Sequence, residues 1–136
     1  MPDRLPLVLV VNDDEAMRNA LQFALQLEGV EVHVHGEGAD VLADRDLSRA
    51  SCLILKDRMP RMDGFELLDC LQARDISLPA ILLTSAATVR LRARAIAAGV
   101  QLVLEKPILD NALVDGVMTI LGHQKHQTPE PLSRNP

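Results

Sequence analysis

Polar side chains that could do chemistry follow four of the short apolar runs of this 136-residue chain. These residues are Asn12, Asp13, Asp14, Lys56, Asp57, Thr84 and Lys106. Carboxylates, a hydroxyl and ammonium groups gathered in one place could hold a divalent cation and receive a phosphoryl group, because that transfer needs a nucleophilic oxygen, a cation and positioning donors. The same groups could instead pair with one another and leave no reactive nucleophile.

The elements that must position these residues are predicted by hydrophobic periodicity. The predicted strands are 5–11, 30–35, 52–55, 80–83 and 101–104, and the predicted helices are 15–28, 38–44, 65–73, 89–98 and 111–121. Parallel strands need a helical crossover, so this alternation predicts an α/β fold with a five-stranded parallel sheet and five flanking helices. Gly29 and Gly99 suit helix C-termini, and Asp110 suits an N-cap.

Every candidate residue comes at the end of a predicted strand. In an open parallel sheet, ligands bind beyond the carboxyl ends of the strands, near the point where the strand order reverses. We therefore expect these side chains to line one pocket at one edge of the sheet.

The composition limits the class of protein. The sequence is 48% apolar and 24% charged, with two Phe and no Trp or Tyr, which predicts a globular domain with an aliphatic core. A net charge of −5 argues against a nucleic-acid partner, since phosphate backbones are bound mainly by Lys and Arg. No apolar run approaches the ~18 residues of a membrane span. We expect a cytoplasmic protein without a membrane partner, in which Cys52 and Cys70 are reduced thiols.

The domain is expected to occupy residues 1–122. Residues 123–136, HQKHQTPEPLSRNP, contain three prolines and almost no apolar side chain, so this tail is predicted to be disordered. The alternative is that it begins a linker to an output domain.

Several motifs together resemble the receiver domain of bacterial two-component response regulators over residues 5–122. They are VLVVNDDEAMRNAL, LILKDRMPRMDGFELL, LPAILLTSAA, AIAAGV and VLEKP. The resemblance implies a doubly wound, flavodoxin-like sheet of order 2-1-3-4-5. Family members carry two acidic residues after the first strand, a phospho-accepting aspartate ending the third, a Thr or Ser ending the fourth, and a Lys before a commonly cis Pro after the fifth. Asp13, Thr84, Lys106 and Pro107 match the second acidic residue, the hydroxyl, the lysine and the proline.

Two positions depart from this pattern, since Asn12 replaces the first acidic residue and Lys56 replaces the phospho-accepting aspartate. The family pocket has three carboxylates and one lysine, an excess of negative charge that one Mg²⁺ balances. Here Asp13 faces Lys56 and Lys106, so positive charge exceeds negative. An ammonium ~4 Å from another unit charge interacts by about 4 kcal/mol at an effective dielectric of about 20. We expect a Lys56–Asp13 ion pair, weak or absent Mg²⁺ binding and no cofactor.

Each of these residues also has a simpler structural interpretation. Lys56 could extend into solvent without touching the pocket, and Asp13 or Asp14 could cap the helix that follows. Thr84 could be an ordinary hydroxyl at a strand end, and Lys106 could simply pair with Asp13.

Asp57 is the alternative phospho-acceptor. Sliding the third strand by one residue would present Asp57 to the pocket, but it would also turn Leu53 and Leu55 to their opposite faces. The loop that runs from the acceptor position through the Met59-Pro60 turn to Gly64 would then be one residue shorter than the corresponding loop of the family. In the unshifted register, Asp57 is expected to point away from the pocket as a solvated loop carboxylate.

Two other groups of side chains could serve binding. Arg90 and Arg94 lie one helical turn apart with Arg92 offset, which makes a basic stripe. Such a stripe is most often a solvated helix face, but the resemblance implies that this helix, the fifth strand and the last helix can mediate dimerisation or partner docking. His33 and His35 share one face of the second strand. We interpret them as structural, because no Cys, Asp or third His is placed to complete a metal site.

The sequence therefore predicts a stand-alone pseudo-receiver in two-component (phosphorelay) signal transduction. It would be a non-enzymatic adaptor that binds a histidine kinase or another two-component protein, or its own copy through the fourth helix and fifth strand. The alternative is a phosphorylatable receiver that uses Asp57. A flavodoxin-like electron carrier or nucleotide binder is disfavoured, because no Gly-rich phosphate loop follows the first strand and no aromatic residue can stack on a flavin.

Overall fold

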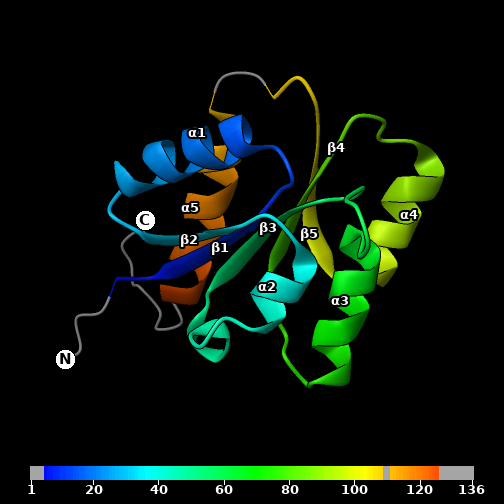
Figure 1. The fold of residues 1–136 in the computed structure, drawn as a ribbon. Helices are drawn as coiled ribbons and strands as arrows, with labels where there is room; N and C mark the ends of the chain where they lie inside the picture. Colours follow the sequence, from blue (N-terminus) through cyan, green and yellow to red (C-terminus); the bar gives the residue numbers. More distant parts are fainter. Residues whose placement is uncertain (1–4, 109–110, 126–136) are drawn as a thin grey trace, which may run out of the picture.

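The computed structural model describes residues 5–108 and 111–125. A parallel sheet of five strands forms its centre, in the spatial order β2-β1-β3-β4-β5 (Figure 1). The strands are β1 Leu7–Val11, β2 Glu31–His35, β3 Cys52–Lys56, β4 Ala80–Thr84 and β5 Val100–Glu105. This order confirms the doubly wound, flavodoxin-like sheet expected from the sequence.

Helices cover both faces of the sheet: α1 and α5 lie on one face, and α2, α3 and α4 on the other (Figure 1). The helices are α1 Glu15–Gln26, α2 Gly38–Leu42, α3 Gly64–Ala73, α4 Val89–Ala97 and α5 Ala112–Lys125, and a short 3-10 helix, η1, spans Leu47–Arg49. Helical crossovers are required here because a tight hairpin cannot join parallel strands.

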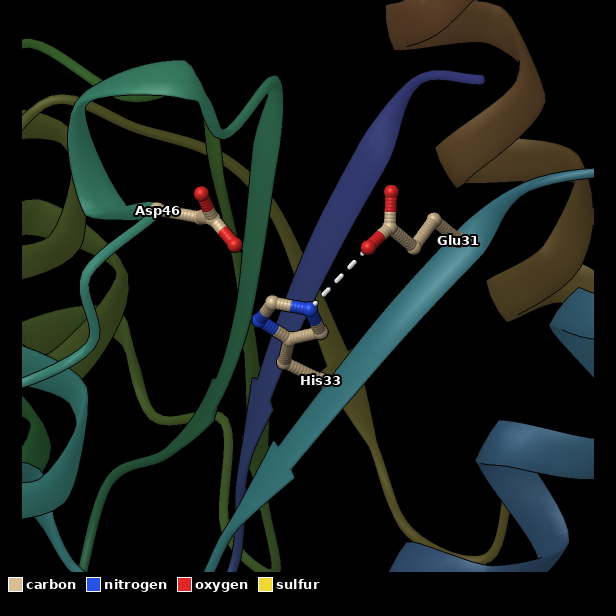
Figure 2. Close-up of side chains that lie close together, drawn as sticks. All are labelled: Glu31, His33 and Asp46. Atoms are coloured by element: carbon tan, nitrogen blue, oxygen red, sulfur yellow. Dashed lines mark hydrogen bonds and ion pairs between the residues drawn. The ribbon is translucent and has the colours of Figure 1, made fainter. Parts of the chain in front are cut away.

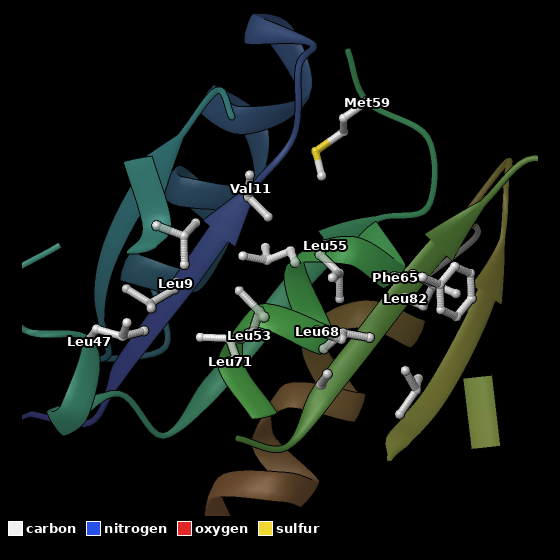
Figure 3. Packing of buried hydrophobic residues seen from close by; sticks show 14 of the residues in the cluster. Leu9, Val11, Leu47, Leu53, Leu55, Met59, Phe65, Leu68, Leu71 and Leu82 are labelled. Atoms are coloured by element: carbon white, nitrogen blue, oxygen red, sulfur yellow. The ribbon is translucent and has the colours of Figure 1, made fainter. Parts of the chain in front are cut away.

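Alternate side chains of the strands contribute to two separate apolar clusters. On the side of α2, α3 and α4, Leu53 and Leu55 of β3 share a cluster with Phe65 and Leu71 of α3 (Figure 3). On the opposite side, Ile54 lies in a cluster with side chains of α1 and α5. Burial on both faces accounts for strands that read as continuous apolar runs rather than as alternating ones.

Side chains and glycines mark the ends of the helices. The carboxylate of Asp63 accepts a hydrogen bond from the backbone N–H of Glu66, and the side chain of Glu66 accepts one from the N–H of Asp63, forming a capping box on α3. Gly29 and Gly99 have φ angles of 82° and 87°, the left-handed conformation predicted for these helix ends. The predicted cap Asp110 lies outside the described residues.

The observed elements differ from the predicted ones mainly at their ends. Lys56 and Thr84 are the last residues of β3 and β4, and α5 continues to Lys125. The helix η1 was not predicted, because three residues are too few to show a period. Positions 126–136 of the predicted tail lie outside the described part of the chain. Within residues 5–108 and 111–125, no helix has the length and apolar character that crossing a bilayer requires.

Candidate functional site

The candidate pocket lies at the carboxyl ends of the strands. The chain runs from β1 outward to β2 and then crosses back to β3 on the other side of β1, so the strand order reverses between β1 and β3. Such a reversal opens a crevice above the sheet in which ligands bind. Asp13, Lys56 and Thr84 follow or end the strands beside it, as the sequence predicted.

Three polar residues follow β1, and each makes different contacts. Asn12 is fully buried, its Oδ1 accepts a hydrogen bond from the backbone N–H of Asp14 at 2.9 Å, and its Nδ2 has no partner among the described residues. The Asp14 carboxylate caps α1 by accepting from the N–H groups of Ala16 and Met17. The capping interpretation is therefore correct for Asp14, and Asp13 remains for the pocket.

Lys56 directs its ammonium group at Asp13. Lys56 Nζ lies 2.9 Å from Asp13 Oδ1, so the expected ion pair is formed and Lys56 does not extend into solvent away from the pocket. This hydrogen bond is the main reason that the pKa of Asp13 lies below its ordinary value; burial opposes the shift, and the charges of Lys56 and Lys106 add to it.

The register of β3 places Lys56 at the strand end. Lys56 pairs with Leu83 of β4 in an uninterrupted parallel ladder. Gly64 packs closely under this strand end: its N–H donates to the carbonyl of Asp57 at 2.9 Å, and a Cβ atom at Gly64 would collide with the carbonyl oxygen of Lys56. The one-residue slip considered from the sequence is not adopted.

Asp57 nevertheless reaches the pocket residue Thr84. Thr84 is buried, and its Oγ1 donates a hydrogen bond of 2.8 Å to Oδ2 of the half-buried Asp57. The prediction that Asp57 points away as a solvated carboxylate was wrong. The register between β3 and β4 explains the contact: Lys56 pairs with Leu83 and the N–H of Asp57 donates to the carbonyl of Leu83 at 3.1 Å, which brings Asp57 beside Thr84, the next residue of β4.

The end of β5 contributes Lys106 and Pro107, which are joined by a cis peptide bond as the resemblance implied. The N–H of Lys106 donates to the carbonyl of Thr84 at 2.8 Å, which holds this segment beside β4. The suggested Lys106–Asp13 pair is not made, since the Lys106 ammonium forms no ion pair with a carboxylate in the described part of the chain. Lys106 acts on Asp13 through its charge alone.

Comparison with known proteins identifies the family to which the chain belongs. The family model described as "Response regulator receiver domain" matches residues 8–118, from β1 into α5. The chain belongs to this receiver family. Receiver domains are signalling modules of two-component systems that interact with histidine kinases and other signalling proteins.

Curated relatives of this receiver include two regulators. They are the C4-dicarboxylate transport transcriptional regulatory protein DctR of Rhodobacter capsulatus, 37% identical over 129 residues, and the transcriptional regulatory protein FixJ of Azorhizobium caulinodans, 38% identical over 128 residues. Both alignments cover 93% of this chain, but only 66% of DctR and 60% of FixJ. The chain thus spans less than two thirds of the length of these relatives.

Solved structures of receivers share the fold. The response regulator StyR is 32% identical with a TM-score of 0.79, and the similarity covers 90% of this chain and 63% of StyR. The structure of FixJ-N is 29% identical with a TM-score of 0.75, and covers 96% of this chain and 100% of FixJ-N.

The basic stripe of this receiver lies on α4. Arg90, Arg92 and Arg94 are all exposed. The guanidinium carbon of Arg94 lies 4.1 Å from the centre of the Phe65 ring, a cation–π contact that joins α4 to α3. The guanidinium groups of Arg90 and Arg92 form no hydrogen bond or ion pair with another residue of the described ranges. Two of the three arginines are therefore available to a partner.

A second polar cluster lies on the edge strand β2. His33 and His35 share a face as predicted, but the statement that no Asp is placed beside them was wrong. Asp44 Oδ2 accepts hydrogen bonds from His33 Nδ1 at 2.9 Å and from His35 Nε2 at 2.8 Å. Burial alone would raise the pKa of Asp44, but the N–H of Asp46 and the two imidazoles lower it to about 2.

Sequence reasoning missed both contacts for the same reason. Asp57 and Thr84 are 27 positions apart, and Asp44 is 11 positions from His33. Each pair joins a strand residue to a loop residue, so no periodic pattern relates its members. The only signal in the sequence was the acidic character of the two loop residues.

Proposed function

We propose that this receiver is a pseudo-receiver, an adaptor whose output does not depend on phosphorylation at the standard position. The observation that carries the proposal is the 2.9 Å contact between Lys56 Nζ and Asp13 Oδ1. At the position where the family has its acceptor carboxylate, this chain has an ammonium group that is already paired. A protonated lysine has no lone pair with which to attack phosphorus.

The pocket residues do not suit a Mg²⁺ ion. Magnesium requires oxygen ligands in near-octahedral geometry and is bound in proteins through carboxylates. Asn12 is neutral and its Oδ1 already accepts from Asp14, while the Asp13 carboxylate is held by Lys56. Lys56 and Lys106 outweigh Asp13, and even with Asp57 included the charges only balance. We therefore assign weak or no Mg²⁺ binding to this pocket and no cofactor to the chain.

The hydroxyl of Thr84 is also engaged. Because it donates to Asp57 at 2.8 Å, a carboxylate of the chain itself holds this group. No added phosphoryl group is needed to fix the end of β4. Binding to a partner would then be set by the abundance of the protein and not by its modification.

The partner we propose is a histidine kinase or another two-component protein in the cytoplasm, and a second copy of the chain is a further candidate. The exposed Arg90 and Arg92 on α4 suit an acidic surface, and β5 lies beside this helix. The net charge of −5 favours protein over nucleic acid as the binding partner.

A second candidate function is a phosphorylatable receiver that uses Asp57. One observation favours it: the Asp57 carboxylate is half-buried beside the Thr84 hydroxyl, in an open hollow that is also lined by Arg58 and Thr88. A carboxylate in this place has an oxygen nucleophile, which Lys56 lacks.

Incubation with acetyl phosphate and Mg²⁺, followed by measurement of intact mass, tests both functions. We expect no stable gain of a phosphoryl group by the natural sequence. The double variant Asn12→Asp, Lys56→Asp restores the family charges and serves as the positive control, which should bind Mg²⁺ and gain one phosphoryl group.

The variant Asp57→Asn separates the two functions. A phosphoryl group gained by the natural sequence and lost in Asp57→Asn would overturn the pseudo-receiver and support the alternative. If the double variant failed to bind Mg²⁺, the charge balance would not be what disables the pocket.

A further inference from the structure

The edge strand β2 carries a polar cluster that the pocket does not use. Glu31, His33 and His35 alternate along β2 and face the side of α2, whereas Val32 lies in the cluster under α1 and α5. The segment between α2 and β3 brings Asp44, Asp46 and Arg49 against them.

His33 is held by Asp44 through one ring nitrogen and presents the other to two further carboxylates. Nδ1 donates to Asp44 Oδ2 at 2.9 Å, and Nε2 lies 3.2 Å from Glu31 Oε2. Figure 2 shows the imidazole with Glu31 approaching from β2 and Asp46 from the segment before β3. The Asp44 side chain is only 7% exposed, and it also accepts from His35 and from the N–H of Asp46, so its position is fixed.

This arrangement matches the way proteins orient a histidine that binds a metal. A metal-bound imidazole generally donates its other N–H to a carboxylate, which fixes the ring and raises the basicity of the ligating nitrogen. Asp44 fills that role for Nδ1, which leaves Nε2 as the ligating atom.

The possible ligand atoms are close enough to share one ion. One atom from each of Glu31, His33 and Asp46 lies within 4.8 Å of the others. Ligands bonded to one zinc ion at ~2.0–2.2 Å are at most about 4 Å apart. Glu31 and Asp46 are 38% and 40% exposed, so small rotations of these side chains can close the difference.

Charge also favours a divalent cation here. Arg49 contacts Glu31 Oε1 at 3.0 Å and Asp46 Oδ2 at 3.6 Å, so both carboxylates already converge on one cationic group. Once an ion has replaced the Nε2 proton of His33 and the imidazoles are neutral, the three carboxylates of the cluster exceed the single arginine by two charges, the opposite balance to that of the pocket. Arg49 Nε is buried without a hydrogen-bond partner among the described residues, so the guanidinium is incompletely satisfied where it lies.

We propose that Glu31, His33 and Asp46 form a binding site for a divalent transition-metal ion, with Asp44 as the positioning residue of His33. One imidazole and two carboxylates match Zn²⁺, whereas Mg²⁺ and Ca²⁺ prefer oxygen ligands alone. The ion takes the place of the proton on His33 Nε2 and displaces Arg49 from the two carboxylates. A bound ion would tie β2 to the segment that leads into β3.

Calorimetric titration with Zn²⁺ tests the site. The experiment uses the full chain carrying His123→Asn and His126→Asn, because these are its only other histidines. We expect one Zn²⁺ per chain and, in ¹⁵N NMR of the imidazoles, loss of the proton from His33 Nε2 with Nδ1 still protonated. Asp44→Asn should weaken binding by about 10- to 100-fold.

Matched variants on the same strand locate the ion. His33→Asn should abolish binding, whereas His35→Asn, which removes the neighbouring imidazole that shares Asp44, should retain it. Arg49→Gln should bind Zn²⁺ more tightly, because the competing cation is gone, and a gain in affinity cannot arise from a folding defect. Circular dichroism checks that the histidine variants are folded.

Three results would overturn the site. They are the absence of saturable Zn²⁺ binding, binding that persists in folded His33→Asn, and binding in which Zn²⁺ engages Nδ1 instead of Nε2. Unchanged or weaker binding by Arg49→Gln would contradict the convergence of Glu31 and Asp46 on the ion.

Discussion

We propose that the change of charge sign at position 56 alters what the pocket can hold. An acceptor carboxylate and a metal ion are both replaced, in our proposal, by one lysine that is bonded to Asp13. The contact involves partly exposed side chains, 25% exposed for Lys56 and 34% for Asp13. Such pairs contribute only about 0.2–1 kcal/mol to stability. In our proposal, the importance of Lys56 therefore lies in the chemistry that it prevents, not in the stability that it adds.

The Lys56–Asp13 pair should make stability depend on pH in the acidic range. The pKa of Asp13 in the folded protein lies below its ordinary value of 3.8. A lowered carboxyl pKa stabilises the fold above the unfolded-state value, and this stabilisation is lost as pH falls through the folded-state pKa. We expect Lys56→Gln to lower the melting temperature at neutral pH, and this difference to shrink as pH falls below 3.8.

Thermal unfolding of both proteins over that pH range measures the effect. Lys106→Gln is the matched control, because its ammonium group forms no ion pair with a described carboxylate. A difference of the same size and pH dependence in Lys106→Gln would show that the effect belongs to general charge and not to the pair.

At the scale of elements, the junction between β3 and α3 decides which residue faces the pocket. The β3 ladder ends at Lys56, and the capping box of Asp63 and Glu66 defines where α3 begins. Gly64 lets the two elements approach closely, since any larger side chain would meet the backbone of Lys56. The junction therefore holds Lys56 in register and Asp57 beside Thr84.

Gly64→Ala should destabilise the protein by about 1–3 kcal/mol, the usual range for overpacking. Its Cβ would collide with the carbonyl oxygen of Lys56, a backbone atom that cannot rotate away as a side chain can. Urea unfolding measures the change. Gly36→Ala is the control, because its Cβ would meet only the flexible end of Arg18, at 3.4 Å. Equal destabilisation by the two variants would show that the close approach at Gly64 is not required.

At the scale of the whole molecule, the sheet is buried between two layers of helices (Figure 1). Neighbouring residues of β3 face opposite layers: Leu53 belongs to the cluster under α3 and Ile54 to the cluster under α1 and α5. Both side chains are fully buried. A chain with two Phe and no Trp or Tyr thus forms its core from aliphatic side chains on both sides of the sheet.

Leu53→Ala and Ile54→Ala should each destabilise the fold by about 2–5 kcal/mol, because each removes buried methyl groups and leaves a cavity. Ile96→Ala, on the exposed face of α4 with 74% of the side chain accessible, should change stability by no more than about 0.5 kcal/mol. Denaturant unfolding compares the three. If one β3 variant behaved like Ile96→Ala, the sheet would be open to solvent on that face.

The sequence by itself determined the order of the elements, the strand ends at which polar residues gather, and the unusual lysine at position 56. These features are local: periodicity marks strands and helices, glycines with positive φ end helices, and motif spacing places Lys56 relative to the turn that follows it. The pairing of Lys56 with Asp13 also followed, because the strands β1 and β3 are neighbours in the family fold and the charges are opposite.

Only the tertiary structure decided where the loop carboxylates lie. Asp57 bonds to Thr84 and Asp44 bonds to His33 and His35, although the sequence had predicted a solvated Asp57 and no aspartate placed beside the histidines. The neighbour of Asp57 depends on the register between β3 and β4, which pairs Lys56 with Leu83 and lets the N–H of Asp57 donate to the carbonyl of Leu83. The neighbours of Asp44 depend on how the segment after α2 packs against β2. No pattern in the linear sequence encodes that register or that packing.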